Sequence, residues 1–395
     1  MEHPWLGIWL EKAKTPANYP AVRRSGTVKL LVEPDAVQST VRPTAFAIDT
    51  LIVGQGLAGT LLAWELERAG QRVATIDACT RGGASRAAGG LMNPLTGPRL
   101  AVSPDLARRC EQARTHYELL AAQLGQPLVE PMPIRRLCRD AVEQGRARDM
   151  RHPWLGVWQH ADTRPDLFHA PFGSLDIHQG WRLDLAALLK GSAAHWAMPD
   201  QAATAGFDWS AIRLHGQGVH WQGHAIDCVV SCEGAAITKN PHWHSLPLHA
   251  DGGESLSLHL PIDLPGAISA GFTLVPLGRQ RYWLGATHHP GRVVSGPTDA
   301  GRQALLNALA ARLRMPLPIE VLGHCAGTRM APPDREAVLG RHPRWPWLAI
   351  FNGLGSRGIL RAPDSAVQLA RHLATGAPLP EDRDVMRYAH HLAWT

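Results

Sequence analysis

The sequence predicts a fold of the α/β class, α+β overall, in which a parallel sheet with a nucleotide-binding turn is interleaved with an antiparallel sheet. Three observations predict it. An apolar run from Thr50 to Val53 ends in a glycine turn that opens a helix. A second apolar run, from Cys228 to Cys232, ends in Glu233 and Gly234. Residues 254–287 alternate between apolar and polar side chains, as antiparallel strands do.

The first element is a βαβ unit of the kind that binds a dinucleotide. In its Gly-x-Gly-x-x-Gly turn, the first glycine permits a tight bend, the second lets the backbone approach a pyrophosphate, and the third lets the helix pack on the strand. The helix N-terminus offers free N–H groups to the phosphates. An acidic residue closes the second strand 23 residues after the first glycine, where a carboxylate can accept both ribose hydroxyls. The predicted binding residues of this unit are Gly54, Gly56, Leu57, Ala58, Gly59 and Asp77.

A loop of small residues follows the second strand. It runs from Gly82 to Pro94 and leaves room for a flat ligand to approach the backbone. Residues 104–124 carry apolar side chains at helical spacing, with Tyr117 and Leu120 near one face. From about 129 to 178, short Pro-rich segments indicate a separate sheet.

The rest of the chain alternates helices and strands. Predicted in chain order are a helix from Leu185 to Leu189, strands at Cys228–Cys232, Ser255–Leu260, Phe272–Pro276 and Arg281–Ala286, a helix over 298–313, a strand at Trp347–Phe351, and a helix ending near Ala374. The last helix is preceded by a second glycine turn, Gly355-Ser356-Arg357-Gly358.

These elements predict domains that are assembled from separated pieces. Residues 1–45 form an N-terminal extension. The nucleotide-binding domain comprises residues 46–128, 179–240 and 322–385, and the substrate domain comprises 129–178 and 241–321. A seven-residue segment, His3 to Trp9, nearly repeats at His152 to Trp158, and two copies are too few for a repeat fold.

Composition restricts the class of protein. The chain has 395 residues, 45% of them hydrophobic, which is enough for two packed domains. No apolar run approaches the length of a membrane span and no basic-then-apolar leader opens the chain, so no membrane association is expected. The six cysteines form no CxxC pair, so neither a metal site nor a disulfide framework is expected. Each cysteine is expected to be a small buried hydrophobe in a reduced, cytoplasmic protein.

The formal net charge of +6 is carried by 35 arginines and only five lysines. A basic chain can indicate a polyanionic partner such as RNA. However, no basic run is interleaved with aromatic residues, and we expect Arg135-Arg136 and Arg146-Ala147-Arg148 to lie on solvated faces. The charge therefore leaves RNA binding open without favouring it.

The ordered set of motifs resembles the D-amino-acid oxidase and glycine oxidase family of FAD-dependent oxidoreductases, over roughly residues 47–385. The resemblance rests on the turn at 54–59, Ala84-Ser85 with Gly89-Gly90, Val229 to Gly234, Pro276 through Gly285-Ala286-Thr287, Gly327-Thr328-Arg329 with Asp334, and Gly353 to Pro363. Within the family, the Gly-Ser-Arg-Gly turn is most similar to that of the oxidase domain of bifunctional tRNA 5-methylaminomethyl-2-thiouridine biosynthesis proteins.

The resemblance implies a Rossmann-like FAD-binding domain with noncovalent FAD and an interleaved antiparallel-sheet substrate domain, the flavin lying between them. It places Ser85 at the pyrophosphate and Gly89 and Gly90 near the flavin. The N–H groups of the C-terminal turn would point at the flavin pyrimidine edge, where the reduced ring gains negative charge. The cofactor-binding residues implied beyond the first turn are Ser85, Gly89, Gly90, Gly234, Gly355, Ser356, Arg357 and Gly358.

The family's chemistry is hydride transfer from a carbon that bears an amine to flavin N5, after which the imine hydrolyses. Arg329 stands at the position of the family's carboxylate-binding arginine, and an arginine fork holds a carboxylate through two parallel hydrogen bonds. Arg357 is a second candidate, although glycine-oxidase-like members carry this arginine one position earlier, where this chain has Ser356. Tyr282 is the third predicted catalytic residue.

Alternatives stay open for the individual residues. Arg329 could instead pair with Asp334 and brace its loop, and Tyr282 could pack on a sheet face. His288 and His289 follow the Tyr282 strand and could meet substrate. No lysine occurs after Lys239, so the lysine that sarcosine-oxidase relatives place beside the flavin is missing, and the electron acceptor stays open.

Three functions follow from these observations. The first is FAD-dependent oxidation of the C–N bond of a small amine or amino acid, including N-substituted glycines. The second is a stand-alone oxidase that cleaves a carboxymethyl group from a tRNA wobble uridine. The third is a flavin-binding subunit without amine oxidation. The oligomeric state is not predicted.

Overall fold

The computed structural model describes residues 48–77, 83–95, 100, 105–156, 159, 167–196, 207–215, 218–221 and 224–392. All of them belong to one compact unit, residues 45–395. The N-terminal extension, Cys79, the first copy of the near-repeat and the last two residues of its second copy lie outside the described residues, so those predictions are not addressed by the structure.

The first sheet has a parallel centre that is built from three distant parts of the chain. Its main strand order is β17-β18-β10-β1-β2. The last four of these strands run parallel to one another, whereas β17, at the edge, is antiparallel to β18. The strands are β1 (Ile48–Val53), β2 (Val73–Ile76), β10 (His224–Ser231), β17 (Val338–Arg341) and β18 (Leu348–Asn352), and β8 (Arg213–His215) and β9 (Gly218–Trp221) extend the sheet beside β10. Central strands such as β18 are buried along their whole length, as expected of a parallel sheet that is covered on both faces.

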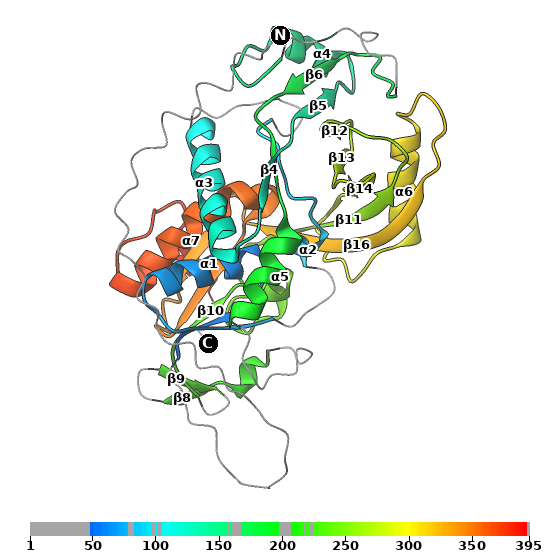
Figure 1. Cartoon of the computed structure of the whole chain (residues 1–395). Coiled ribbons are helices and arrows are strands. Elements are labelled where there is room, and N and C mark those ends of the chain that lie inside the picture. Colours follow the sequence, from blue (N-terminus) through cyan, green and yellow to red (C-terminus); the bar gives the residue numbers. More distant parts are fainter. Residues whose placement is uncertain are drawn as a thin grey trace. The chain divides into compact units, whose positions relative to one another are not determined.

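Helices cover one face of this sheet (Figure 1). They are α1 (Leu57–Arg68), α3 (Leu106–Leu124), α5 (Leu185–Trp196) and α7 (Gly358–Thr375). Side chains such as Leu61, Tyr117 and Leu369 are fully buried between these helices and the sheet. The opposite face packs against Trp243, Trp347 and the C-terminal segment around Val385.

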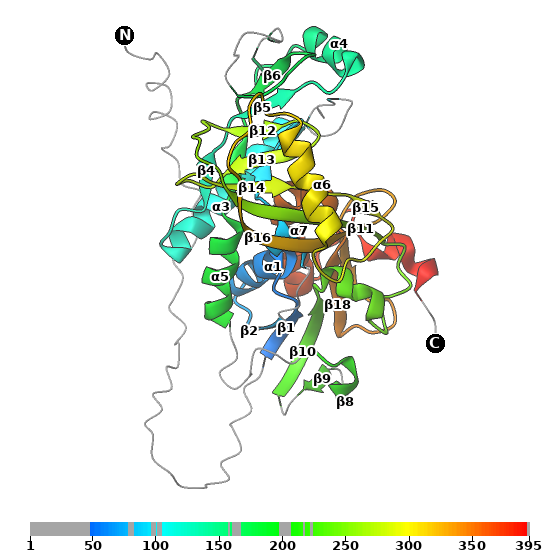
Figure 2. The ribbon, with the colours of Figure 1, turned by 90° about the vertical axis from the view of Figure 1, so that its right-hand side faces the viewer.

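The second sheet is mostly antiparallel. Its order is β15-β11-β14-β13-β12-β5-β6, with β16 paired along β11, and only β12 and β5 run parallel. The strands are β5 (Ile134–Leu137), β6 (Ser174–Ile177), β11 (His249–His259), β12 (Ala267–Ser269), β13 (Thr273–Pro276), β14 (Arg281–Gly285), β15 (His289–Pro290) and β16 (Glu320–Ala331). Helix α6 (Asp299–Ala310) covers one face (Figure 2), where Leu305 and Leu309 pack against Leu256 and Leu284.

The remaining elements are one small sheet and two short helices. A three-stranded sheet consists of β3 (Leu91–Met92), β7 (Trp181–Leu183) and β4 (Val129–Pro131), and the short helices are α2 (Ala84–Ala87) and α4 (Ala141–Asp149). The predicted α/β fold class, with its parallel and antiparallel sheets, is confirmed. The domain bounds inferred from the sequence stay a prediction.

Candidate functional site

One cavity of roughly 880 Å³ is lined by residues of both large sheets. Its lining comes from the ends of β1, β10 and β18 in the first sheet, from α2 and the segment after it, and from β11, β14 and β16 in the second sheet. The cavity therefore lies at the carboxyl ends of the parallel strands, where open α/β sheets bind their ligands.

The first glycine turn forms one end of the cavity. Gly54 has φ of +106°, and a Cβ atom there would lie 2.4 Å from the carbonyl oxygen of Cys232. A Cβ atom on Gly59 would lie 1.9 Å from the carbonyl oxygen of Gly54. Both positions therefore require glycine. Gly56, Leu57 and Ala58 line the cavity at the start of α1, where the N-cap residue Gly56 has no side chain to cap the helix.

Ser85 lies directly in front of this helix N-terminus. Its Oγ accepts a hydrogen bond from the backbone N–H of Leu57 at 3.0 Å, and a Cβ atom on Gly56 would lie 3.3 Å from the same oxygen. Asp77, at the end of β2, also lines the cavity, and its carboxylate forms an ion pair with Arg86. The structure thus brings Ser85 and Asp77 to the glycine turn, as the sequence predicts.

The segment after α2 is held against the antiparallel sheet by two hydrogen bonds. The indole Nε1 of Trp283 and the hydroxyl of Ser255 both donate to the carbonyl oxygen of Ala87, at 2.9 and 2.8 Å. A Cβ atom on Gly89 would lie 2.6 Å from the Trp283 ring, and one on Gly90 would lie 2.0 Å from the carbonyl oxygen of Leu183. These two glycines therefore let the backbone pass closely between its neighbours.

The end of β10 contributes a carboxylate that is held in place. Glu233 accepts hydrogen bonds from the side chains of Ser231, Asn240 and Trp209, at 2.7, 2.6 and 3.1 Å. Gly234 follows with φ of +54° and lines the cavity with Glu233.

The C-terminal glycine turn forms another wall of the cavity. Residues Gly355–Arg357 make one 3-10 turn, and α7 begins at Gly358. No side chain caps the first turn of α7. The Tyr117 hydroxyl of α3 donates to the carbonyl oxygen of Ile359 at 2.9 Å and fixes the start of the helix.

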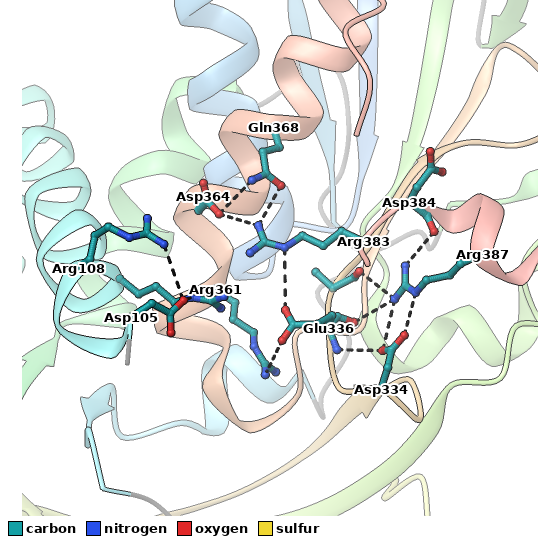
Figure 3. A network of polar contacts seen from close by, with 12 residues as sticks. Asp105, Arg108, Asp334, Glu336, Arg361, Asp364, Gln368, Arg383, Asp384 and Arg387 are labelled. Atoms are coloured by element: carbon teal, nitrogen blue, oxygen red, sulfur yellow. Dashed lines mark hydrogen bonds and ion pairs between the residues drawn. The ribbon is translucent and has the colours of Figure 1, made fainter. Parts of the chain in front are cut away.

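Figure 3 shows a polar network that includes Arg361 and Asp364 of α7, the helix that follows this turn. Arg361 donates to Glu336 at 3.2 Å, and Arg383 donates to Asp364 at 2.6 Å. Burial, together with the positive charges of neighbouring arginines, lowers the pKa of Arg361, while Glu336 opposes that shift. Asp334 accepts hydrogen bonds from Arg387 and from the Tyr388 hydroxyl.

Arg329 lines the cavity from β16, but it does not pair with Asp334. Its Nη2 donates to Asp251 Oδ2 at 2.5 Å and lies 3.1 Å from Nδ1 of His288. His288 also lines the cavity. Arg357, the other predicted carboxylate-binding residue, lines the cavity at the start of α7.

Tyr282 does not reach the cavity, which corrects its predicted catalytic role. Its side chain is 1% exposed and packs in the core beneath α6. The hydroxyl donates to the carbonyl oxygen of Ile262 at 2.7 Å and accepts from the N–H of Leu264 at 3.2 Å. Because neighbouring strand residues face opposite sides, Trp283 rather than Tyr282 faces the cavity.

Arg135 and Arg136 do not lie on a solvated face, contrary to the prediction. Arg135 forms two hydrogen bonds with Asp176, at 2.8 and 3.0 Å. Arg136 is buried, pairs with Glu143 and lines the cavity. The sequence around Arg135 and Arg136 does not identify their acidic partners, which lie on β6 and α4.

Four of the five described cysteines are buried, as predicted, whereas Cys325 on β16 is exposed. Burial raises the pKa values of Cys110 and Cys228 to about 11. Among the described residues, no group of three or more His, Cys, Asp or Glu side chains is arranged to hold a metal ion. In the same part of the chain, no helix is long and apolar enough to cross a bilayer.

Sequence reasoning did not assign several cavity residues. They are Arg86, Arg136, Phe207, Trp209, Lys239 and Trp283. The period-2 alternation around Tyr282 was the available signal for Trp283, but it does not indicate which face of a strand points to the cavity.

The arrangement fits a dinucleotide that carries a flat ring system. The turn at Gly54–Gly59, Ser85 and the start of α1 form a cradle for a pyrophosphate. Gly89 and Gly90 leave a strip without side chains toward Trp283 and the antiparallel sheet. The start of α7 presents backbone N–H groups to the same cavity.

Comparison with known proteins agrees with this geometry. The model of the DAO family, described as FAD dependent oxidoreductase, matches residues 49–372. The tRNA 5-methylaminomethyl-2-thiouridine biosynthesis bifunctional protein MnmC of Maricaulis maris (strain MCS10) is 29% identical over 335 residues. That match covers 83% of this chain and 52% of the relative, so the chain spans about half of its length. Glycine oxidase of Geobacillus kaustophilus (strain HTA426) is 26% identical over 359 residues, 82% of this chain and 92% of the relative.

Solved structures show the same fold. The crystal structure of glycine oxidase from Geobacillus kaustophilus has a TM-score of 0.67 at 23% identity, covering 84% of this chain and 96% of that one. Iminodiacetate oxidase (IdaA) from Chelativorans sp. BNC1 has a TM-score of 0.65 at 23% identity, covering 84% and 97%. The family match spans most of the chain and agrees with the dinucleotide cradle. The chain therefore belongs to the DAO family of FAD-dependent oxidoreductases, with FAD as its cofactor.

Proposed function

We propose that this enzyme oxidises the C–N bond of a small amine of the amino-acid or N-substituted-glycine kind. The observation that carries the proposal is the continuity of the cavity, which joins the pyrophosphate cradle at Gly54–Gly59 to Arg329 and His288 on the antiparallel sheet. Relatives and structural neighbours named glycine oxidase and iminodiacetate oxidase support a small amine of this kind, either as the free acid or as its derivative.

The chain's own residues position the reactants. FAD, when bound, supplies the acceptor for the hydride that leaves the carbon next to nitrogen. Trp283 and Ser255 fix the segment of Gly89 through the carbonyl oxygen of Ala87, and so define the wall between the two sheets. The uncapped start of α7 places backbone donors where negative charge can be stabilised. Arg329 offers a cation for the polar group of the substrate.

An anaerobic visible-absorption titration of the holoenzyme with amino acids, N-substituted glycines and their amides tests the proposal. Bleaching of the flavin band by one member of the panel is the expected result. In Arg329→Leu, the concentration needed for bleaching should rise at least tenfold while the flavin stays bound, since this change removes the cation and not the cofactor cradle. Arg135→Leu is the matched control, because Arg135 pairs with Asp176 on the same sheet without lining the cavity. Bound flavin that no member bleaches would refute amine oxidation.

A tRNA wobble-uridine oxidase is the second candidate, and the match to the bifunctional MnmC relative specifically favours it. The Gly-Ser-Arg-Gly turn and the net charge of +6 agree with it. Specific tRNA binding should weaken steeply with salt, because phosphate contacts release counterions. Filter binding of purified tRNA between about 50 and 200 mM salt measures this slope. Absence of a salt-sensitive complex would remove this candidate.

The lining of the cavity does not support the third function considered from the sequence, a flavin-binding subunit without catalysis. A shortage of polar groups in the cavity would favour it. Instead, the polar residues Arg329, His288 and Ser255 line the cavity. These residues support a catalytic role.

A further inference from the structure

Arg329 and Asp251 form a cross-strand pair that the fold itself sets. The two residues are directly opposite each other in the antiparallel register of β11 and β16, so both side chains point to the same side of the sheet. Nη2 of Arg329 donates a hydrogen bond to Oδ2 of Asp251 at 2.5 Å, and because both groups are ionic this bond is charge-assisted. Arg329 lines the cavity, whereas Asp251 is not among the residues that line it.

The position of these contacts on the guanidinium decides what Arg329 can still bind. An arginine grips a carboxylate either end-on, through Nη1 and Nη2, or side-on, through Nε and Nη2. Both forks need Nη2. This nitrogen has two hydrogens, and both are directed to partners: one to Asp251, the other to Nδ1 of His288 at 3.1 Å, which accepts when it carries no proton.

The two partners do not hold Arg329 equally. The His288 side chain is 61% exposed, so its contact competes with water and breaks readily. The Asp251 side chain is 35% exposed, and its Oδ1 is buried with no hydrogen-bond partner. Arg329 is therefore the main cation that stabilises this carboxylate, and a substrate carboxylate that takes Nη2 would leave Asp251 without it.

We propose that Asp251 is a specificity-determining residue that competes with a substrate carboxylate for Arg329. Among the described residues, Nη1 and Nε of Arg329 have no recorded partner, so the pair keeps these N–H donors with little net charge, which suits a neutral acceptor. The preferred substrates are then amines whose acidic group is masked, such as amino-acid amides and esters, over the free acids. This inference rests on the proposed amine oxidation, because it names the substrate class of that site.

Binding of two simple probes, acetate and acetamide, to the FAD-loaded protein tests the inference without turnover. The perturbation of the flavin absorption band reports dissociation constants for both. The compared quantity is the affinity for acetate divided by the affinity for acetamide. In Asp251→Ala, this ratio should be at least about tenfold higher than in the unmodified protein. Asp251→Asn, which keeps an acceptor beside Nη2 but removes the charge, should give a smaller gain. The double variant Asp251→Ala/Arg329→Leu should lose the gain.

Asp176→Ala is the matched control, because it removes an aspartate that pairs with an arginine in the same sheet, away from the cavity, and it should leave the ratio unchanged. An acetate-to-acetamide ratio in Asp251→Ala that is unchanged or lower overturns the inference and makes Asp251 a brace for Arg329. Bleaching by amines without the predicted ratio change refutes this inference alone. The ratio change without bleaching by any amine refutes amine oxidation alone.

Discussion

His116 on α3 is predicted to make the folded protein sensitive to mild acid. The side chain is 10% exposed, and its Nε2 is buried without a hydrogen-bond partner. Burial lowers the pKa of His116 from 6.5 to about 4, and the charge of Arg68 acts in the same direction. Glu65 lies 3.6 Å from Nε2 of His116 and would favour the protonated ring, but it also pairs with Arg68, and the pKa of His116 stays lowered by burial.

The sign and size of the effect follow from proton binding. The unfolded chain protonates His116 below pH 6.5, whereas the folded chain does so only near pH 4. The unfolded state therefore binds more protons between these values, and the free energy of unfolding falls as the pH decreases through them. The full difference corresponds to about 3 kcal/mol, of which about 2 kcal/mol is lost between pH 7 and pH 5.

Urea unfolding at fixed FAD concentration, at pH 7 and pH 5, measures this loss. His116→Leu, which has a similar volume and no titratable group, should reduce the change in the free energy of unfolding between the two pH values by about 2 kcal/mol. His169→Leu is the control, since His169 is exposed. An equal pH dependence in the unmodified protein and in His116→Leu would show that the ring is not held neutral, and the reasoning from burial would fail.

Two further predictions concern the cofactor cradle and the misassigned tyrosine. Gly59→Ala should lower the flavin-to-protein absorbance ratio severalfold, because its Cβ atom would lie 1.9 Å from the carbonyl oxygen of Gly54. Gly145→Ala is the control, since its Cβ atom would point into open space on α4, and it should leave this ratio unchanged. Equal flavin content in the two variants would contradict the packing argument. Tyr282→Phe should lower the free energy of unfolding by about 1 kcal/mol through its lost hydrogen bonds, with the rate of flavin reduction by the substrate unchanged. A tenfold slower reduction would return Tyr282 to the site.

The parts of the site that could be predicted are those encoded within a short stretch of chain. The turn at Gly54–Gly59 forces its own geometry, since the clashes that exclude a side chain arise from its own backbone and from the adjacent strand. The helix and second strand follow directly in the chain, and Asp77 lies 18 residues after Gly59, so its position is also local. Ser85 lies only eight residues further along the chain, and its Oγ contacts the N–H of Leu57; its predicted role at the pyrophosphate stays a prediction.

The parts that could not be predicted depend on register between distant strands. Arg329 meets Asp251 because β11 and β16 pair over their length, and 78 positions separate the two residues along the chain. Nothing near Arg329 distinguishes Asp251 from Asp334, the partner considered from the sequence. Tyr282 failed for a related reason: alternation identifies two faces of a strand, but only the packing of α6 decides which of them is core.

These pairings change how the charge of the chain should be interpreted. A net charge of +6 suggests an attractive potential for anions, yet three arginines that line the cavity, Arg86, Arg136 and Arg329, are each paired with a carboxylate. Their fields are largely cancelled at short range, so the excess of arginine does not by itself make the cavity cationic. The net charge is therefore weak support for an anionic substrate inside the cavity. A polyanion such as tRNA would have to be recognised by arginines on the outer surface, and this is the contribution that the salt dependence of tRNA binding isolates.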